Sequence, residues 1–375
     1  VTVTNGKSSV VDICRQIWQL LGNKADSLGT KGLDANVNIK QRIANLTTPD
    51  FIDLYKIINL LKANNVDYLA LEASSHGLQQ RRLANLAANI VAFTNFSRDH
   101  LDYHIDMEDY FKAKTLLFSE IVKNGCKAVL NADDARYSKL LEICQRNKVS
   151  TISYGIKDSN IRLLERKPHS SYQYIKFNCE GEIYEGNIRI SGEFQIYNIL
   201  CAIAIVRESG HKLADIVEIL ADLQPVKGRM QLASNFNDAQ IFVDYAHTPD
   251  ALLNILANLH KEKTKRLILL FGCGGNRDQG KRKEMALIAN KYADKTIITD
   301  DNPRFEDPAQ IRQQICSHID EVIEIADRKE AIKTAMLMLK KDDILLIAGK
   351  GHETYQIIGD KKIPFNDAEI VKSYE

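Results

Sequence analysis

The sequence predicts two successive α/β domains, each built around a parallel β-sheet that helices cover on both faces. Short apolar runs alternate with longer amphipathic segments along most of the 375 residues, and this alternation is typical of β-α-β units. The segment 225–229 interrupts the alternation, which then restarts. A chain of this length also exceeds what one hydrophobic core ordinarily supports. We therefore expect one domain over residues 1–228 and a second over residues 229–375.

In the first domain, strands are expected where short apolar runs end in polar loops. Buried strands are predicted at residues 67–72, 89–94 and 127–131. An amphipathic helix is predicted over residues 107–123. Residues 161–190 are more polar, with a β-rich piece at 172–177, and indicate an antiparallel extension of the sheet. Helices are predicted to follow at about 197–209 and 213–223.

The second domain repeats the alternation more regularly. Its strands are predicted at residues 240–244, 266–271, 295–299, 321–325 and 344–348. Its helices are predicted at residues 250–260, 280–292, 308–318 and 328–340. Because each strand is followed by a helix, these elements predict a Rossmann-like parallel sheet.

Composition and charge exclude several classes of protein. The formal net charge is +1, so the chain lacks the positive field that gathers nucleic acid. No apolar stretch reaches the ~18 residues of a membrane-spanning helix, and no signal peptide precedes the first domain. The seven cysteines are dispersed, without metal-ligand spacing, which indicates reduced thiols in a cytoplasmic protein. Residue 1 falls inside an expected strand, which suggests that a further segment precedes it.

A phosphate-binding loop is indicated at residues 4–9, TNGKSS, ahead of a helical pattern. Gly6, Lys7 and Ser8 match the end of the P-loop pattern. Backbone N–H groups at a helix start cradle phosphate, lysine supplies charge, and a serine hydroxyl can bind Mg²⁺. The complete pattern requires glycine where Val1 stands, so a glycine-containing loop before an ordinary helix is the alternative.

Two polar segments follow strands of the first domain, at the sheet edge where parallel sheets bind ligands. EASSHG at 72–77 offers a carboxylate, two hydroxyls and an imidazole, and its alternative interpretation is a polar loop with a capping serine. The segment 95–104 suits a magnesium site, which the phosphate loop favours, or a solvated loop. A further alternative there is a zinc site made by Asp99, His100, Asp102 and His104. Lys114 lies on the predicted helix, and its spacing predicts a solvated side chain.

Four polar segments follow strands of the second domain. They are DYAHTPD at 244–250, FGCGGNRD at 271–278, DNPR at 301–304 and GKGHE at 349–353. The glycine pattern differs from GxGxxG followed by a ribose-binding acid, which argues against a dinucleotide site. An arginine fork recognises a carboxylate and acidic groups hold an ammonium, so these segments suit a zwitterionic amino acid. Solvated loop ends are the alternative.

Taken together and in this order, the motifs resemble those of the Mur ligase family, and the resemblance covers nearly the whole chain. The motifs are TNGKSS, TTPD, LEASSHGL, FTNFSRDHLDYH, YFKAK, NADD, GRM, VDYAHTPDAL, FGCGGNRDQGKR, TDDNPR and AGKGHE. The resemblance implies a central P-loop ATPase-like parallel-sheet domain followed by a Rossmann-like C-terminal α/β domain. The family's N-terminal UDP-binding domain would precede residue 1.

The resemblance also implies roles for individual residues. Those implied to contact ATP are Asn5, Gly6, Lys7, Ser8, Ser9, Asn95, Asn131, Asn198, Arg229, Asp244 and His247. Those implied to bind Mg²⁺ are Ser8, Glu72, His100 and Lys114, and those implied to be catalytic are Lys7, His100 and Lys114. The family's lysine at position 114 is carbamylated, which turns a cation into an anionic oxygen ligand. Those implied to contact a muramoyl dipeptide are Thr47, Thr48, Ser74 and Arg82.

The DNPR segment is the family's mark for meso-diaminopimelate, and lysine-adding relatives carry another residue in place of Arg304. The distal carboxylate of diaminopimelate can pair with an arginine fork, whereas lysine ends in a bare ammonium. The residues implied to bind this amino acid are Arg277, Asp301, Asn302, Arg304, Gly349 and Glu353. Two positions depart from the family. Val3 replaces a glycine, where a side chain is expected to obstruct phosphate or force an unfavourable φ, and Gln195 replaces an asparagine.

The implied activity is that of an ATP- and Mg²⁺-dependent, ADP-forming ligase. It would add meso-diaminopimelate to UDP-N-acetylmuramoyl-L-alanyl-D-glutamate through an acyl-phosphate, in peptidoglycan synthesis and hence in cell shape and cell division. We expect a cytoplasmic monomer without nucleic-acid partner or membrane insertion. The alternatives are a lysine-adding ligase, a folylpolyglutamate synthetase-like ligase and a degenerate, non-catalytic nucleotide-binding protein.

Overall fold

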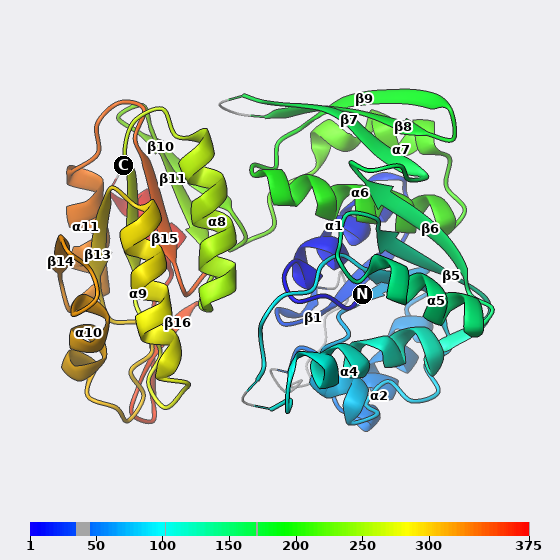
Figure 1. Cartoon of the computed structure of the whole chain (residues 1–375), viewed down its shortest axis with the longest axis horizontal. Coiled ribbons are helices and arrows are strands. Elements are labelled where there is room, and N and C mark those ends of the chain that lie inside the picture. Colours follow the sequence, from blue (N-terminus) through cyan, green and yellow to red (C-terminus); the bar gives the residue numbers. More distant parts are fainter. Residues whose placement is uncertain (35–45, 102, 170–171, 375) are drawn as a thin grey trace. The chain divides into compact units, whose positions relative to one another are not determined.

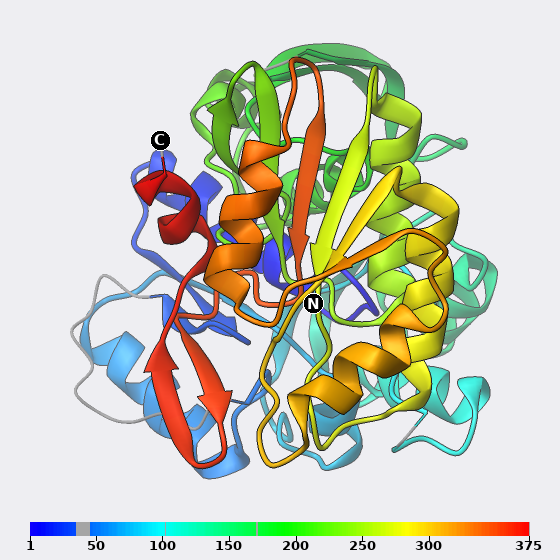
Figure 2. The same ribbon diagram turned by 90° about the vertical axis from the view of Figure 1, so that its left-hand side faces the viewer.

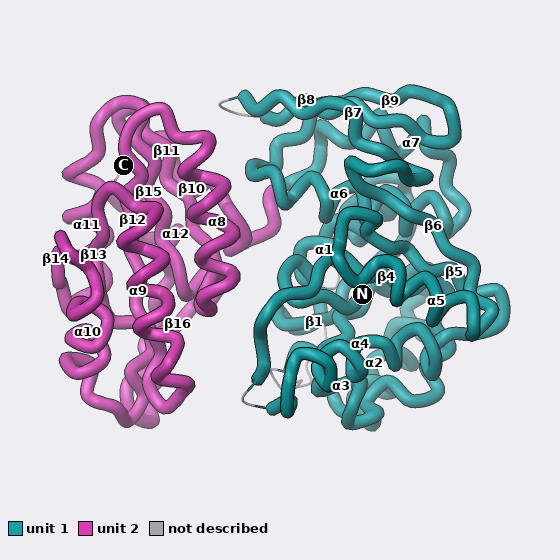
Figure 3. The backbone as a smooth tube through the Cα atoms, viewed as in Figure 1, with its two compact units in different colours: residues 1–224 teal, residues 225–375 magenta. Residues whose placement is uncertain are grey.

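The computed structural model describes residues 1–34, 46–101, 103–169 and 172–374. The chain divides into two compact units, Val1–Gln224 (unit 1) and Pro225–Glu375 (unit 2), which Figure 3 distinguishes by colour. The division falls at the start of the segment that interrupts the sequence pattern, slightly before the expected boundary between residues 228 and 229. Among the described helices, none combines the length and apolar character needed to cross a membrane.

Unit 1 contains two β-sheets (Figure 1). Its strands are β1 (Ala25–Gly29), β2 (Gly32–Asp34), β3 (Tyr68–Leu71), β4 (Ala88–Phe93), β5 (Val122–Asn131), β6 (Ser150–Gly155), β7 (Ile161–Pro168), β8 (Gln173–Cys179) and β9 (Glu182–Ile188). The smaller sheet has the order β2-β1-β3, and the larger has the order β4-β5-β6-β7-β8-β9. Strands β4 to β7 run parallel, whereas β7, β8 and β9 pair antiparallel, which confirms the extension expected at residues 161–190.

Helices cover both faces of the larger sheet. They are α1 (Lys7–Leu20), α2 (Phe51–Ala63), α3 (Ser75–Gln79), α4 (Met107–Ser119), α5 (Tyr137–Arg146), α6 (Glu193–Glu208) and α7 (Leu213–Glu218), with a short 3₁₀ helix at Leu220–Asp222. Phe111 and Phe118 of α4 and Leu140 of α5 share a core with Val91 and Phe93 of β4. On the other face, α1 packs against α6, which contacts β4, β5 and β6.

The first residues of the chain join the two sheets of unit 1. Val1 N donates to Leu71 O at 2.8 Å, beside β3, and Thr2 N donates to Ala92 O at 3.0 Å, beside β4. Thr2 also forms a parallel bridge with Phe93. This extended segment therefore lies between β3 and β4, and it delivers residues 5–9 to the carboxyl edge of both strands.

Unit 2 contains one six-stranded sheet and a hairpin. Its strands are β10 (Gln231–Phe236), β11 (Ala239–Asp244), β12 (Leu267–Phe271), β13 (Lys295–Ile298), β14 (Val322–Glu324), β15 (Ile344–Ala348), β16 (Tyr355–Ile358) and β17 (Lys361–Pro364). The order is β10-β11-β15-β12-β13-β14, in which β10 pairs antiparallel with β11 and the other five strands run parallel. Strands β16 and β17 form the hairpin.

The helices of unit 2 enclose this sheet (Figures 1 and 2). They are α8 (Pro249–Glu262), α9 (Gly280–Tyr292), α10 (Pro308–Cys316), α11 (Arg328–Leu337) and α12 (Asp367–Ser373). Apolar residues of α11 and α12 share a core with β11, β12, β13 and β15, while α8 and α9 lie on the opposite face. Thr248 and Asp307 cap α8 and α10, and each is followed by proline, which suits a first helical position.

The arrangement confirms the predicted α/β class. Helix α9 and strand β15 begin and end at the predicted residues, whereas α6 begins at Glu193, earlier than the expected residue 197. Gly192, with φ of 96°, lies directly before α6. The sequence periodicity alone did not mark this start because Glu193 and Gln195 alternate with Phe194 and Ile196 in the first turn of α6.

Candidate functional site

The phosphate loop of unit 1, residues 4–9, is braced by two asparagine side chains. Asn95 holds the backbone of Asn5, since its Oδ1 accepts from Asn5 N at 2.9 Å and its Nδ2 donates to Asn5 O at 2.6 Å. Gly6 has φ of 104°, and a Cβ there would lie 2.5 Å from Asn198 Oδ1. Glycine is therefore required by both the backbone conformation and the neighbouring amide. The result is a fixed backbone turn at the start of α1, the arrangement that binds phosphate.

The remaining nucleotide candidates of unit 1 lie around this turn. Ser8 and Ser9 are buried in the first turn of α1. Asn131, at the end of β5, donates through Nδ2 to Thr94 O at 2.7 Å, at the end of β4. The predicted asparagines thus hold the loop and the adjacent strand ends, a role that their residue type alone did not indicate.

Two lysine ammonium groups converge on one backbone oxygen beside the loop. Lys7 Nζ donates to Val3 O at 2.8 Å and to Thr4 O at 3.1 Å, and Lys114 Nζ donates to the same Val3 O at 2.8 Å. Lys114 is buried on α4, and this burial lowers its pKa well below the ordinary value; the charge of Lys7 lowers it further. The solvated side chain that the spacing of Lys114 predicts is therefore wrong.

Val3 itself adopts an ordinary backbone conformation. Its φ lies outside the left-handed region, and its side chain has no exposed surface. The unfavourable φ expected from the loss of glycine is therefore not found. Because a bound phosphate would occupy accessible space, a fully buried Val3 side chain does not line that space.

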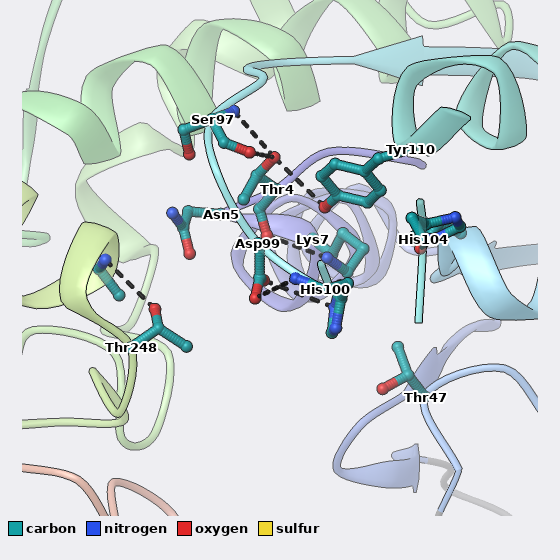
Figure 4. Close-up of polar contacts among 12 residues, drawn as sticks. Thr4, Asn5, Lys7, Thr47, Ser97, Asp99, His100, His104, Tyr110 and Thr248 are labelled. Atoms are coloured by element: carbon teal, nitrogen blue, oxygen red, sulfur yellow. Dashed lines mark hydrogen bonds and ion pairs between the residues drawn. The ribbon is translucent and has the colours of Figure 1, made fainter. Parts of the chain in front are cut away.

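The His100 imidazole lies beside Lys7 (Figure 4), and the charges of Lys7 and Lys114 both act on it. His100 Nε2 is 3.4 Å from Asp99 Oδ2, yet burial lowers the pKa of His100 to about 4. The carboxylate of Asp99 opposes this shift, and the charges of Lys7 and Lys114 add to it. His100 also has φ of 54°, in the left-handed region that few non-glycine residues adopt. A neutral imidazole can donate its lone pair to a metal ion.

A network of hydroxyl groups links Glu72 to the TTPD segment. Thr30 donates to Glu72 from both its backbone N, at 3.0 Å, and its Oγ1, at 3.2 Å, and Thr30 Oγ1 lies 3.1 Å from Thr47 Oγ1. Thr48 Oγ1 lies 3.0 Å from Ser74 Oγ. Glu72 does not contact His100 or Lys114 directly. Thr30, which sequence reasoning missed, thus joins the Glu72 carboxylate to Thr47, and Thr48 Oγ1 donates directly to Glu72 O at 2.8 Å.

Arg82 completes this group of substrate candidates. Its Nη1 donates to Thr48 O at 2.9 Å, and Ser74 N donates to Thr48 Oγ1 at 2.9 Å. A Cβ on Gly77 would lie 2.7 Å from Thr48 Cβ, so glycine allows the segment to approach. The structure therefore brings together all four residues predicted to contact the dipeptide.

The zinc alternative does not form among the residues that the structure describes. His104 is buried, with Nε2 3.0 Å from Ser75 Oγ and Nδ1 3.3 Å from Asp109 Oδ2, so both of its nitrogens are used to join α3 to α4. In the described part of the chain, no three His, Cys, Asp or Glu side chains are grouped to hold a metal ion. Asp102, one of the expected zinc ligands, lies outside the described residues.

Unit 2 brings its nucleotide candidates together at the end of β11. Asp244 accepts hydrogen bonds from Met230 N at 2.6 Å and Ala246 N at 2.7 Å. Burial raises the pKa of Asp244 to about 6, against the opposing effect of Arg229. The Arg229 guanidinium lies 4.5 Å from the centroid of the Tyr245 ring. His247 is exposed, with Nδ1 2.8 Å from Tyr245 O.

The amino-acid candidates gather at the neighbouring ends of β12, β13 and β15. We call Asp301, Asn302, Arg304, Gly349 and Glu353 the strand-end cluster. A Cβ on Gly349, which has φ of 113°, would lie 2.7 Å from Asp301 Oδ2, and Asn302 Nδ2 donates to Glu353 Oε2 at 2.9 Å. Arg304 Nη1 donates to Gly275 O at 3.0 Å. Asp301 and Arg304 form no salt bridge with any described residue, so both charges are available to a ligand.

Arg277 is the exception among the predicted residues of unit 2. It is exposed in the loop after β12, and no contact joins its side chain to the strand-end cluster within the described residues. Conversely, sequence reasoning missed Lys350, which is fully buried and contacts both Asn302 and Glu353. Because lysine is rarely buried, its residue type did not indicate that position 350 belongs to the site.

Comparison with known proteins matches both units to family domains. Residues 1–206 match the Mur ligase middle domain, and residues 228–351 match the domain described as Mur ligase, glutamate ligase domain. The chain is 46% identical to a UDP-N-acetylmuramoyl-L-alanyl-D-glutamate–2,6-diaminopimelate ligase of Rickettsia bellii, covering 99% of this chain and 78% of that protein. The enzyme of the same name from Anaplasma marginale is 44% identical over 99% of this chain and 78% of its own length.

Solved structures show the same likeness. The structure of a UDP-N-acetylmuramoyl-L-alanyl-D-glutamate–2,6-diaminopimelate ligase has a TM-score of 0.71 and 32% identity, covering 99% of this chain and 76% of that chain. A Mycobacterium tuberculosis folylpolyglutamate synthase, solved with ADP and AMPPCP, has a TM-score of 0.73 at 17% identity, over 92% of this chain and 87% of its own. The second likeness shows a shared fold alone.

Proposed function

This chain belongs to the Mur ligase family, and on that premise we propose which of its residues carry the family's chemistry. It is an ATP-dependent, ADP-forming amide-bond ligase of peptidoglycan synthesis, which adds 2,6-diaminopimelate to UDP-N-acetylmuramoyl-L-alanyl-D-glutamate. The observation that carries the proposal for unit 1 is the convergence of Lys7 and Lys114 on Val3 O beside a neutral His100. A lysine ammonium beside a fixed backbone turn at a helix start suits the phosphates of ATP.

The donor groups of unit 1 fit magnesium. Ser8 would offer a hydroxyl and Glu72 a carboxylate, both oxygen donors of the kind Mg²⁺ prefers, while His100 would offer a neutral nitrogen. A magnesium ion held there would neutralise charge that develops on the transferred phosphoryl group. Lys7 would place its ammonium on the same phosphates.

Lys114 fits this set once its amine is carbamylated. Burial favours the neutral amine, which can attack carbon dioxide. An N–C bond forms, a proton leaves to solvent, and the resulting carbamate is an anion with two oxygen donors. The modification would convert a buried group of unfavourable charge into one that the neighbouring Lys7 stabilises.

The reaction would begin with the D-glutamate γ-carboxylate of the precursor, which Thr47, Thr48, Ser74 and Arg82 would orient. A carboxylate oxygen attacks the γ-phosphorus of ATP, the bond to ADP breaks, and an acyl-phosphate forms. The amine of diaminopimelate then attacks the acyl carbon to give a tetrahedral intermediate. The C–O bond breaks, phosphate leaves with that oxygen, and the amine loses a proton.

The strand-end cluster would select the amine donor. Arg304 would pair with the distal carboxylate of meso-diaminopimelate, and Asp301 and Glu353 would hold ammonium groups. Arg229, Asp244 and His247 would contact ATP from unit 2. We further propose that the protein acts as a monomer in the cytoplasm, where ATP is supplied.

The proposal is tested by phosphate release with Mg²⁺, ATP and the precursor, comparing meso-diaminopimelate with L-lysine. We expect release with diaminopimelate and at least about 100-fold lower kcat/KM with lysine, because lysine leaves Arg304 unpaired. Reactions without amino acid, without precursor or with EDTA serve as controls. Equal rates with the two amino acids would refute the role of Arg304, and phosphate release unaffected by EDTA would refute the magnesium site.

A further inference from the structure

Lys350 forms one corner of a hydrogen-bonded triangle in unit 2, and Asn302 and Glu353 form the other two corners. Its side chain has no exposed surface, and its Nζ donates to Glu353 Oε2 at 2.8 Å and to Asn302 Oδ1 at 3.1 Å. Asn302 Nδ2 closes the triangle by donating to the same Glu353 Oε2 at 2.9 Å. Asn302 Oδ1 also accepts from Ile357 N at 2.9 Å, which fixes which way the amide faces.

The triangle divides the Glu353 carboxylate into two different oxygens. Oε2 accepts from both Lys350 and Asn302, whereas no described residue donates to Oε1. Asn302 in turn has both lone-pair positions of its oxygen and one of its N–H groups occupied. A ligand ammonium at this place would therefore meet Oε1 of a carboxylate that cannot rotate.

Burying a lysine is costly unless its charge is paired and hydrogen-bonded. The other two fully buried cations of unit 2 are paired for structural purposes: Arg328 with Asp367, and Arg282 with Glu306. Lys350 differs because its partner Glu353 belongs to the strand-end cluster and is only three residues away on the same loop. An apolar residue would fill the space of the Lys350 side chain at a lower desolvation cost. The buried ammonium is therefore explained by the two side chains that it holds in place, Glu353 and Asn302.

We propose, on the premise of the proposed function, that Lys350 is a positioning residue for the amine donor. It holds Glu353 and Asn302 in the orientation that binds diaminopimelate, without touching that amino acid itself. Its removal would weaken binding of the amino acid specifically, since ATP and precursor are assigned to other residues.

The test is a double-mutant cycle on the full chain. We expect Lys350→Met to raise the KM for diaminopimelate by about 30-fold or more, with KM for ATP and for precursor changed by less than about threefold. Glu353→Gln should raise the same KM to a similar degree. The double variant Lys350→Met/Glu353→Gln should be no worse than Glu353→Gln alone within about threefold, because Lys350 acts through Glu353. Lys361→Met, an exposed lysine of the same unit, is the matched control and should resemble the wild type.

Lys350→Met leaves the Glu353 carboxylate without its cation, so its melting temperature is measured alongside. If that variant does not fold, Lys350→Gln, which is uncharged but keeps a hydrogen-bond donor, carries the test with the same expected rise in the KM for diaminopimelate. An unchanged KM for diaminopimelate in Lys350→Met, a uniform rise for all three substrates, or additive effects in the double variant would overturn the role of Lys350. A wild-type chain that shows no ligation with diaminopimelate would overturn the proposed function as well.

Discussion

Cations are held differently in the phosphate-loop region of unit 1 and around the sheet of unit 2. In unit 1, Lys7 and Lys114 are satisfied by a backbone carbonyl that both of them share. In unit 2, Arg328 and Lys350 are each paired with a carboxylate. The fully buried cations of unit 2 named here thus have a carboxylate partner, whereas the two unit 1 lysines share a backbone oxygen.

The two units therefore differ in which groups accompany these cations. We propose that phosphate and the carbamate oxygens complete the unit 1 region. The unit 2 region is preorganised by its own ion pairs, and it keeps Asp301 and Arg304 for the ligand. A lysine removed from the unit 1 region should therefore cost activity, whereas removal of Arg328, which pairs with Asp367 away from the strand-end cluster, should cost stability.

The largest expected effect is on activity in unit 1. Lys114→Ala should lower kcat/KM by about 10³-fold or more, because the carbamate and its metal ion are lost. The melting temperature should fall as well, since removal of a fully buried side chain leaves a cavity, so activity is compared at equal amounts of folded protein. Lys112→Ala, an exposed lysine on the same helix, is the control and should keep wild-type activity. Full activity in Lys114→Ala would refute its place in the metal site.

The matching effect in unit 2 is on stability. Arg328→Met should lower the free energy of unfolding by about 3–5 kcal/mol, because it leaves Asp367 buried and unpaired. The double variant Arg328→Met/Asp367→Asn should recover part of that loss. Denaturant unfolding measures both, and a variant as stable as the wild type would contradict the comparison.

A smaller effect is expected where unit 2 meets its ligand. Arg304→Met should raise the KM for diaminopimelate by about 100-fold, because the distal carboxylate loses its partner. The free energy of unfolding should stay close to the wild-type value, since Arg304 supports only backbone carbonyls. A loss of stability without a change in this KM would assign Arg304 to the structural group instead.

Val3→Gly separates packing from catalysis in unit 1. Restoring glycine should lower the free energy of unfolding by about 2–3 kcal/mol, because a fully buried valine side chain is lost. Activity should not rise, since the Val3 backbone already has an ordinary conformation. A marked gain in phosphate release would mean that the valine side chain does obstruct the phosphate site.

The smallest effect is a pH dependence in unit 2. The pKa of Asp244 is raised to about 6 in the folded protein by burial, above the ordinary value of 3.8. The folded state therefore binds this proton more tightly, so the contribution of Asp244 to stability is present below about pH 4 and is lost as pH rises through 6. The loss should be on the order of 3 kcal/mol. The free energy of unfolding, measured from pH 4 to 7, should show this loss in the wild type and not in Asp244→Asn.

Much of this comparison could be predicted from sequence. The strand ends of both units were located because apolar runs stop at polar motifs, and the four dipeptide candidates, Thr47, Thr48, Ser74 and Arg82, do lie together. The motif order identified the family. These patterns lie within short stretches of sequence, so they can be recognised without knowledge of the tertiary structure.

The rest depends on contacts between distant segments. Thr30 meets Glu72 because β1 pairs with β3, and residue type alone gives no sign of that bond. Lys114 and Lys350 are buried against the usual preference of lysine, so spacing predicts the wrong environment for one and no role for the other. Val3 was expected to strain the loop, and only the backbone conformation shows that it does not.

The central claim is that unit 1 activates the precursor as an acyl-phosphate and that diaminopimelate then displaces the phosphate. The most direct measurement uses precursor labelled with oxygen-18 in the D-glutamate γ-carboxylate, unlabelled ATP and ordinary water. The phosphate released during ligation should carry a single labelled oxygen, because one oxygen of the D-glutamate γ-carboxylate leaves with the phosphate. Unlabelled phosphate, formed together with the amide product, would contradict it.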